Sequence, residues 1–400
     1  MVTVKEAENL IFKNIPPPRS RQCTITEAAG AVLLEDLSAD RDFPPYHRVT
    51  MDGIALHTRE FEKGQQSFRV QATQAAGAPP YLLKEGNSCI EVMTGAVLPN
   101  GCDSVIPVEE LERDGDGVRL KAGIPVRAMR NVHQQGSDCK RGALLLKKGD
   151  RLNAPALSVL AAIGKKEFNI AEKPTLAIVS TGNEIVEIDD YPNSYQIRNS
   201  NAYGLSGALQ ARGFPSIPQY RVRDDKDDLE EKISTLLEDM EILILSGGIS
   251  KGKFDYLPEI LLKLGVKNIF DSVRQRPGKP FWVGRTVRNQ IVFALPGNPV
   301  SALICFHRYI LPYLDLRLGA ISHSPLRLAL GERVEFNPPL TFFLPVKIQA
   351  QGLESARVWP VRTQGSGDLI HLLESDGFIE LPAEMNDFPA GFVAPFYAWV

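Results

Sequence analysis

Three turns between residues 180 and 299 carry residue types suited to binding an anion. They are Ser180-Thr181-Gly182-Asn183-Glu184, Ser246-Gly247-Gly248 continuing through Ser250 to Asp255, and Leu295-Pro296-Gly297-Asn298-Pro299. Each follows a run of apolar residues typical of a strand that is buried on both faces. Glycine lets the backbone approach a ligand closely, and amide groups at a turn or helix start attract negative charge. These three turns are therefore candidate ligand-binding loops.

A fourth loop adds positive charge. Residues 274–280 have the sequence RQRPGKP, which places Arg276 and Lys279 on either side of the turn at Pro277 and Gly278. Lysine acts as a point charge and arginine as a planar fork, and both bind phosphate and other oxyanions. A solvated surface turn is the alternative, although Pro-Gly-Lys-Pro is stiff for a plain connection. The loop therefore predicts an oxyanion site.

Two carboxylates, Glu184 and Asp255, are expected at the same place as these loops. Hard oxygen ligands beside phosphate favour Mg²⁺ over zinc. The alternative for both residues is a helix cap or a surface group, which is the commoner role of carboxylates in loops. Neither a nucleophile paired with a base nor a G-x-S-x-G sequence is evident, so covalent catalysis is not indicated.

The elements that must position these loops alternate between strand and helix patterns. We predict strands at 176–184, 217–222, 241–246, 281–285 and 290–299, and helices at 201–213, 226–240, 258–265 and 300–319. Such alternation indicates a parallel, doubly wound sheet, in which ligands bind outside the carboxyl ends of the strands. All four loops would then lie at one edge of the sheet.

The remainder of the chain is helical at its start and otherwise rich in short strands. Helices are predicted at 1–15, 24–36 and 154–164, and short alternating segments follow the proline break at 42–46 and return after residue 322. The fold class is therefore multidomain α/β and β. The predicted domains are an N-terminal helical linker domain (1–44 plus 140–170), an inserted β-rich domain (45–139), a central doubly wound α/β domain (171–320) and a C-terminal β-barrel-like domain (321–400).

Composition narrows the class of protein. Hydrophobic residues at 44% and charged residues at 23% are ordinary for a globular protein, and no apolar run has the length of a membrane span. The N-terminal segment lacks the pattern of a signal peptide, so we expect a cytoplasmic protein without membrane contact. A net charge of −3 argues against a nucleic-acid surface. Five scattered cysteines lack disulfide or zinc spacing.

The order of several motifs resembles the molybdopterin molybdenumtransferase family, the group of MoeA and the gephyrin E domain. In this sequence the motifs are VTMDGIALH, EVMTGAVLPNGCDSVIPVE, GSDCKRG, STGNEI, SGGISKGKFDY, RPGKP, FALPGNPVSA and QGSGDLIHLLESDGFIELP. They follow one another in the family's order and extend over nearly the whole chain. The chain is thus similar to a somewhat divergent member of this family.

The resemblance implies a homodimer that inserts molybdate into adenylylated molybdopterin with Mg²⁺ and releases AMP. It also implies an active cleft between the α/β domain of one subunit and the β domain of the other, with the molybdopterin adenylyltransferase as a candidate partner. Candidate catalytic residues are Asp52, Thr94, Asp138, Glu184, Asp225 and Asp255, with Glu184 and Asp255 as metal ligands. Candidate substrate-binding residues, from the loops and the matched motifs together, are Thr181, Gly182, Ser246, Gly247, Gly248, Ser250, Arg276, Gly278, Lys279, Pro296, Gly297, Asn298, Pro299 and Ser366.

The sequence departs from the family pattern at several positions. The family's Asn-Ser-Ala is here Arg48-Val49-Thr50, its usual Asp after Thr-Gly is Asn183, and extra charge follows Ser250 at Lys251 and Lys253. An arginine that the family carries at the molybdate site is replaced by Pro345. Since strand side chains alternate, Lys347 would face the same way about 7 Å along, and we hypothesise that it supplies the missing charge.

Two other functions remain open from the sequence. One is a non-catalytic paralogue that binds molybdopterin or the finished cofactor, which the changes at Asn183 and Pro345 favour. The other is a nucleotide-pyrophosphate hydrolase that shares only the α/β domain. The sequence does not distinguish molybdate from tungstate, because the two oxyanions have nearly the same size and charge.

Overall fold

A computed structural model describes residues 1–249, 255–349 and 356–399 of the chain. The chain forms two compact units. The larger unit comprises Met1–Glu35, Lys148–Leu157 and Glu167–Val400, and the smaller unit comprises Asp36–Lys147 and Ser158–Lys166. The four-domain division is finer than these two units and stays a prediction.

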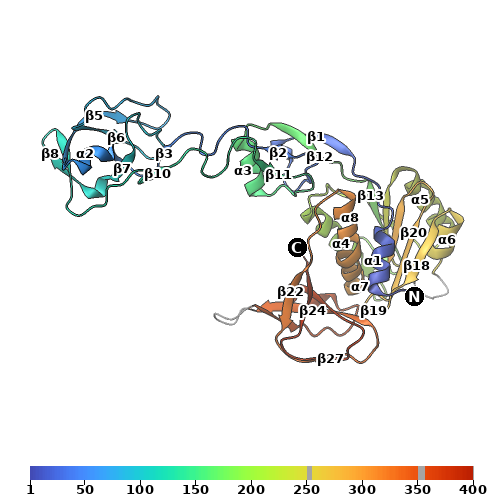
Figure 1. The fold of residues 1–400 in the computed structure, drawn as a ribbon. Helices are drawn as coiled ribbons and strands as arrows, with labels where there is room; N and C mark the ends of the chain where they lie inside the picture. Colours follow the sequence, from blue (N-terminus) through green and yellow to red (C-terminus); the bar gives the residue numbers. More distant parts are fainter. Residues whose placement is uncertain (250–254, 350–355, 400) are drawn as a thin grey trace. The chain divides into compact units, whose positions relative to one another are not determined.

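The larger unit is built on a six-stranded sheet with the order β16-β13-β17-β21-β20-β18. Figure 1 labels its strands β13, β18 and β20. Its strands are β13 (Leu176–Thr181), β16 (Gln219–Val222), β17 (Ile242–Ser246), β18 (Lys267–Ser272), β20 (Pro280–Arg285) and β21 (Ile291–Leu295). Strands β16, β13, β17 and β21 are parallel, as predicted. Because the chain continues from β13 to the edge strand β16 and then to β17 on the other side of β13, a topological switch lies between β13 and β17.

The expectation of a wholly parallel sheet is wrong at one edge. Strand β20 is antiparallel to β21 and to β18. The connections from β18 to β20 and from β20 to β21 are short, whereas parallel neighbours need a long crossover. Strand β18 was not predicted, because its sequence KNIFDS is too polar and irregular to show an alternating pattern.

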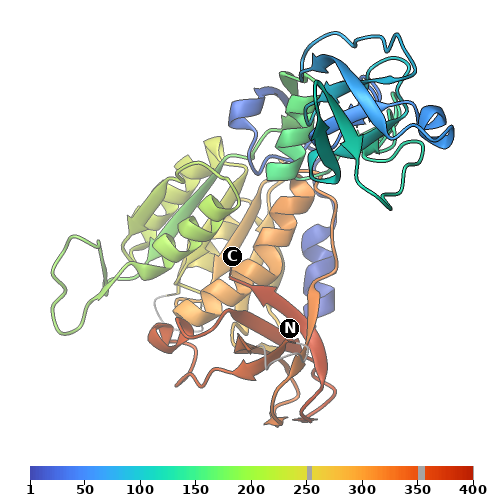
Figure 2. The same ribbon diagram turned by 90° about the vertical axis from the view of Figure 1, so that its left-hand side faces the viewer.

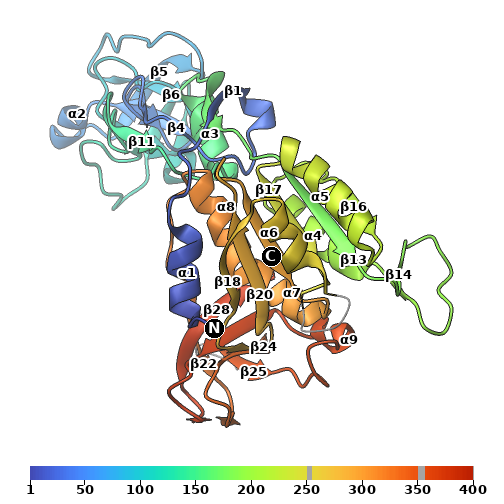
Figure 3. The same cartoon turned by 90° about the vertical axis from the view of Figure 1, so that its right-hand side faces the viewer.

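Helices cover both faces of this sheet (Figures 2 and 3). The helices of the larger unit are α1 (Val4–Phe12), α4 (Ser200–Ala211), α5 (Lys226–Asp239), α6 (Leu257–Lys263), α7 (Pro299–Cys305), the π-helical segment η3 (Phe306–Ile310), α8 (Leu311–Arg317) and α9 (Leu369–Leu372). One face packs against α1, α4, α7 and α8, and the other packs against α5 and α6. The helix predicted over 300–319 is thus confirmed, with an unpredicted π-helical turn in its middle.

The last part of the larger unit is a closed five-stranded barrel, which confirms the barrel-like prediction. Strand β24 pairs with both β25 and β26, so the order β24-β25-β22-β28-β26 returns to β24. The strands here are β19 (Gln275–Arg276), β22 (Leu326–Leu330), β23 (Val334–Glu335), β24 (Thr341–Gln349), β25 (Arg357–Pro360), β26 (Gly377–Leu381), β27 (Asp387–Phe388) and β28 (Val393–Ala398). Strand β19 pairs with β24 and so ties the Arg276 loop to the barrel.

The helix predicted over 24–36 is wrong. The segment contains only the short 3₁₀ helix η1 (Ile25–Glu27), after which Val32 and Leu33 form isolated bridges with Arg151 and Ile170. Gly30 has a φ of 74°, which ends any helix there. Pairing with distant segments has overridden the local helical pattern. The remaining short strands of the larger unit are β1 (Ser20–Thr24), β12 (Glu167–Ala171), β14 (Ile185–Val186) and β15 (Ile197–Arg198).

The smaller unit contains a six-stranded sheet with the order β7-β4-β6-β5-β9-β8. Its elements are β2 (Leu37–Ser38), β3 (Arg48–Val49), β4 (Gly53–Leu56), α2 (Thr58–Glu62), β5 (Ser67–Gln74), β6 (Ser88–Val92), β7 (Ser104–Pro107), η2 (Val108–Glu110), β8 (Leu111–Asp114), β9 (Gly117–Leu120), β10 (Val132–His133) and β11 (Leu144–Leu146). Helix α3 (Ala154–Ala162) crosses the division between the units. The short alternating strands predicted here are confirmed.

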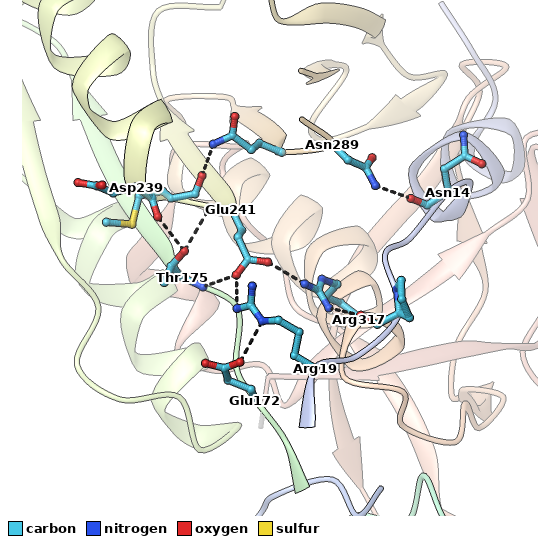
Figure 4. A network of polar contacts seen from close by, with 11 residues as sticks. Asn14, Arg19, Glu172, Thr175, Asp239, Glu241, Asn289 and Arg317 are labelled. Carbon is cyan, nitrogen blue, oxygen red and sulfur yellow. Dashed lines mark hydrogen bonds and ion pairs between the residues drawn. The ribbon is translucent and has the colours of Figure 1, made fainter. Parts of the chain in front are cut away.

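A network of charged side chains anchors the amino end of β17 (Figure 4). The Glu241 carboxylate accepts hydrogen bonds from Arg19 at 2.5 Å and from Arg317 at 2.7 Å. Burial opposes ionisation of Glu241, but the bonds from Arg317 and Arg19 prevail and lower its pKa. The guanidinium of Arg317 is buried, so it depends on this carboxylate for its charge balance.

Candidate functional site

A cavity of about 1590 Å³ lies in the larger unit, at the carboxyl ends of β13, β17 and β21 and against the barrel. Typical small-molecule pockets measure about 300–1,000 Å³, so this one has room for a large ligand. Most of the predicted site residues line it: Thr181, Gly182, Glu184, Ser246, Gly247, Gly248, Asp255, Arg276, Gly278, Lys279, Pro296, Gly297, Asn298, Pro299 and Ser366. Ser250, Lys251 and Lys253 lie outside the described residues.

The loops after β13 and β17 touch at Gly247. A Cβ atom on Gly247, which has a φ of 101°, would collide with the carbonyl oxygen of Thr181. Only glycine therefore permits this close approach between the two loops. Asn201, on α4, joins the loop after β17 to the loop after β21. Its side-chain amide donates to the Ser246 hydroxyl and to the Gly297 carbonyl, both at 2.8 Å. The three predicted turns thus form one connected rim.

A segment of the barrel completes this rim. The Asn298 amide donates to the Ser366 hydroxyl at 2.9 Å, and the backbone N–H of Val300 donates to the Ser366 carbonyl at 3.1 Å. The Asp368 carboxylate in turn accepts from the backbone of Gln364 at 2.7 Å and from the ring of His371 at 2.8 Å. Ser366 is therefore held against the start of α7 by a folded turn rather than by a mobile side chain.

Four cationic side chains line the cavity: Arg198, Arg276, Lys279 and Arg362. Arg198 donates to the backbone carbonyls of Ile188 and Asp190. The other three have no ion pair with a carboxylate in the part of the chain that the structure describes. Unpaired cations around a cavity bind phosphate or another oxyanion through charge-assisted hydrogen bonds. The cavity is suited to an anionic ligand.

Three carboxylates also line the cavity, namely Glu184, Asp224 and Asp255. Asp224 accepts a hydrogen bond from the Thr181 hydroxyl. Within residues 1–249, 255–349 and 356–399, no three His, Cys, Asp or Glu side chains are close enough to form a metal cage. Mg²⁺ does not require such a cage, because it is commonly held by one or two carboxylates with substrate phosphates and water. The donor set of Glu184 and Asp255 therefore fits Mg²⁺.

The barrel side of the cavity bears on the hypothesis that Lys347 replaces a missing arginine. Pro345 lines the cavity, but Lys347, exposed on the same strand, is not among the lining residues. Arg362 lines the cavity, and the backbone N–H of its neighbour Val361 donates to the Pro345 carbonyl at 2.9 Å. The structure therefore favours Arg362 over Lys347 as the cation beside Pro345.

Three predicted residues belong to the smaller unit. The Asp52 carboxylate accepts from the backbone N–H of Thr94 at 2.6 Å and from its hydroxyl at 2.7 Å, and these bonds lower the pKa of Asp52. Asp138 contacts the His133 ring at 2.7 Å, and His133 contacts Arg48 at 3.0 Å. Asp52 and Thr94 are thus joined as one polar pair, and Asp138 belongs to a separate chain of contacts.

Asp225 does not line the cavity. It caps α5, where its carboxylate accepts from the backbone N–H groups of Asp227 and Asp228. Its neighbour Asp224 is the lining residue, and sequence reasoning missed it, as it missed Asn201 and Arg362. Asn201 had a weak signal, because it is a polar residue at the start of the helix predicted over 201–213. Arg362 had only its position just before the QGSG motif.

No helix among the described residues is long and apolar enough to cross a membrane.

Models of known families match almost the whole chain. Residues 2–164 match the MoeA N-terminal region (domain I and II), residues 177–316 the probable molybdopterin binding domain, and residues 327–399 the MoeA C-terminal region (domain IV).

Individual relatives extend over the same length. A molybdopterin molybdenumtransferase of Synechocystis sp. is 39% identical over 400 residues, which is 100% of each chain. One of Staphylococcus epidermidis is 28% identical over 398 residues, covering 98% of this chain and 94% of the relative. A crystal structure of a molybdopterin biosynthesis MoeA protein from Pyrococcus horikoshii has 27% identity and a TM-score of 0.76, covering 100% of this chain and 99% of that one. The chain therefore belongs to the molybdopterin molybdenumtransferase family, as its motifs predict.

Proposed function

We propose that this protein is a molybdopterin molybdenumtransferase that acts in molybdenum cofactor biosynthesis. Its substrates would be adenylylated molybdopterin and molybdate, and AMP would be released. The observation that carries the proposal is the cavity at the strand ends, where Arg276, Lys279 and Arg362 present unpaired positive charge within the described chain. Family membership over the whole length supports the same activity.

The residues of the cavity have distinct roles in this proposal. Backbone amides at Gly182, Gly247 and Gly248 would approach the phosphates, since these residues line the cavity at the strand ends. Arg276 and Lys279 bind the phosphoanhydride and offset the negative charge that develops as the bond to AMP breaks. Arg362 binds an oxyanion on the barrel side.

Glu184 and Asp255 would hold Mg²⁺ in this cavity. The metal ion would neutralise phosphate charge and orient the substrate. With their negative charge directed to the metal, the two carboxylates would repel a bare phosphate less than they do alone.

The assembly that we propose is a homodimer. Asp52 and Thr94 of one subunit would then act on substrate bound by the larger unit of the other, as the family resemblance implies, and Asp138 stays a candidate catalytic residue. A molybdopterin adenylyltransferase would be the source of the adenylylated substrate. The dimer, this partner and the cytoplasmic location all stay predictions.

A second function, binding of molybdopterin or finished cofactor without metal insertion, also has an observation in its favour. The barrel wall of the cavity is apolar at Phe342, Leu344 and Pro345. Such a surface suits a pterin ring, and these three side chains carry no charge for molybdate.

One assay separates these functions. The protein is incubated with adenylylated molybdopterin, Mg²⁺ and molybdate, and both AMP and active molybdenum cofactor are measured. Formation of both supports transfer. Tight binding with neither product supports the binding protein, and AMP release that does not depend on molybdate supports a pyrophosphate hydrolase.

A further inference from the structure

A fully buried polar cluster lies directly beneath the Arg276–Lys279 loop. It consists of Gln275, Tyr309 and Cys305, each with no exposed surface. Burial raises the pKa of the Cys305 thiol to about 12 and raises that of Tyr309 well above its usual range. Both groups are therefore neutral, and the Tyr309 hydroxyl keeps its proton to donate.

Hydrogen bonds fix the Gln275 carboxamide in one orientation. Its oxygen accepts from the Tyr309 hydroxyl at 2.5 Å. Its nitrogen donates to the carbonyls of Pro277 at 3.1 Å and Gly278 at 3.2 Å. If the amide were reversed, two carbonyls would face an oxygen, so the carbonyls of Pro277 and Gly278 set which way the amide points, and the Tyr309 hydroxyl holds its oxygen. The hydroxyl thus acts on the loop backbone through Gln275.

The loop has little freedom to shift on this cluster. A Cβ atom on Gly278 would lie 2.6 Å from the Cys305 sulfur and 2.8 Å from the Gln275 nitrogen. The backbone of Gly278, with a φ of 83°, therefore rests directly on the two buried side chains. On the barrel side, the backbone N–H of Thr341 donates to the Arg274 carbonyl at 3.0 Å. The loop is held from below and from one side.

Tyr309 is itself held firmly. It lies in the π-helical segment η3, a kind of turn that is frequent near functional sites. Its ring packs against Phe281 with centroids 5.3 Å apart. The guanidinium of the neighbouring Arg308 lies 5.2 Å from the Tyr309 ring and is bound to Glu380 and Glu8. The hydroxyl is therefore presented to Gln275 from a rigid support.

We propose that Tyr309 and Gln275 are positioning residues, which hold the loop so that Arg276 and Lys279 converge on an oxyanion of the substrate. Gln275 also borders the cavity, but its amide nitrogen donates to the Pro277 and Gly278 carbonyls and its oxygen accepts from Tyr309, so its role is to position the loop. This inference rests on the proposed function for the identity of the substrate. The geometry beneath the loop does not depend on it.

The test compares Tyr309→Phe with Tyr313→Phe. Tyr313 is a second buried tyrosine, on α8, whose ring packs on Phe293 away from the loop. We expect Tyr309→Phe to raise the KM for adenylylated molybdopterin roughly fivefold to tenfold, the effect of one or two misplaced hydrogen bonds. The kcat at saturation should fall as well, because Arg276 and Lys279 would offset the charge that develops as the bond to AMP breaks. Tyr313→Phe should keep the wild-type KM.

A double variant separates positioning from stability. In Gln275→Met with Tyr309→Phe, both buried partners are apolar, so the thermal midpoint should recover relative to Gln275→Met alone. The KM should remain raised, since the carbonyls of Pro277 and Gly278 have still lost their donor. Recovery of KM together with stability would show a merely structural pair and overturn the proposal, as would a wild-type KM in Tyr309→Phe.

Titration with simple anions keeps the test independent of catalysis. Inorganic phosphate and molybdate are titrated separately into wild type and Tyr309→Phe by calorimetry. Weaker binding of either anion to the variant supports positioning, and it identifies which oxyanion the loop holds. Equal binding to both proteins contradicts it. If wild type makes neither AMP nor cofactor but still shows this difference, the proposed function fails while the positioning role stands.

Discussion

At the scale of single residues, Arg362 is the clearest difference between sequence and structure. Lys347 has the correct strand alternation relative to Pro345, but alternation along one strand does not determine which side chain reaches a cavity. The segment after β25 crosses beside Pro345 and brings Arg362 to the cavity wall. Arg362 could thus supply, from a neighbouring segment, the positive charge that is missing at Pro345.

We predict that Arg362→Ala raises the KM for molybdate about tenfold or more, because a hydrogen bond to a charged group contributes ~1.5–3 kcal/mol. Lys347→Ala serves as the matched control, since it removes one cation from the same barrel without changing the cavity wall. Initial rates of cofactor formation at varied molybdate would measure both. A larger effect in Lys347→Ala would restore the original hypothesis.

At the scale of elements, the two ends of β17 differ: ion pairs hold its amino end, and its carboxyl end borders the cavity. Glu241, just before the strand, binds Arg19 and Arg317, while Ser246 at its other end belongs to the cavity rim. The ion pairs fix the strand against α8 and the N-terminal segment. If the cavity binds substrate as we propose, stability and ligand binding depend on opposite ends of one strand.

We predict that Glu241→Gln lowers the free energy of unfolding by about 2–4 kcal/mol, because it leaves the buried Arg317 without its counter-charge. Glu172→Gln is the control, since it removes an exposed partner of Arg19, and exposed pairs contribute about 0–1 kcal/mol. Urea unfolding of both variants measures the difference. Equal losses would argue that Arg317 finds another partner.

We expect the turn before α9 to be sensitive to pH. The hydrogen bond and the charge of Asp368 raise the pKa of His371, while bonds from Gln364 and His371 lower the pKa of Asp368. Because the folded pKa of His371 lies above its unfolded value of about 6.5, the stabilisation is complete below that pH. It is lost as the pH rises through the raised pKa.

We predict that the His371 ring titrates above pH 6.5 in NMR spectra and that Asp368→Asn moves the midpoint down toward about 6.5. His371→Gln identifies the signal by its disappearance. The turn that carries Ser366 should also become more accessible to hydrogen exchange above the wild-type midpoint. An unchanged midpoint in Asp368→Asn would show that the pair is not formed in solution.

At the scale of the whole molecule, the candidate residues are divided between the two units. Arg276 and Lys279 lie in the larger unit, whereas Asp52 and Thr94 lie in the smaller one. If the active cleft forms between subunits, as we propose, each site needs one unit from each chain. Variants in different units should then complement each other.

We predict that Asp52→Ala and Arg276→Ala are each inactive alone, and that a refolded or co-expressed equal mixture regains about a quarter of wild-type activity. Random pairing makes half of the dimers mixed, and each mixed dimer has one intact site out of two. Cofactor formation by the mixture, with each variant alone as control, measures this. A mixture that stays inactive would place all of these residues in sites within one chain.

The sequence alone predicted most of the main strands and helices and the loops of the cavity rim. Local patterns located β13, β17 and β21, because a strand buried on both faces is a continuous apolar run. They also located the helices between these strands and the barrel strands, because an element that buries one face carries its periodicity in the chain itself. Strand-end glycines and the RPGKP loop identified the cavity rim, since parallel strands bring their carboxyl ends together. The residues of the cavity rim could therefore be predicted without the structure.

Only the tertiary structure decided the rest. The apparent helix at 24–36 gave way to bridges with Arg151 and Ile170, which a local pattern cannot show. The antiparallel edge depended on connections too short for a crossover. Arg362, Asp224 and the Tyr309–Gln275 pair reach the loops from distant positions, and such contacts depend on packing between segments rather than on residue spacing.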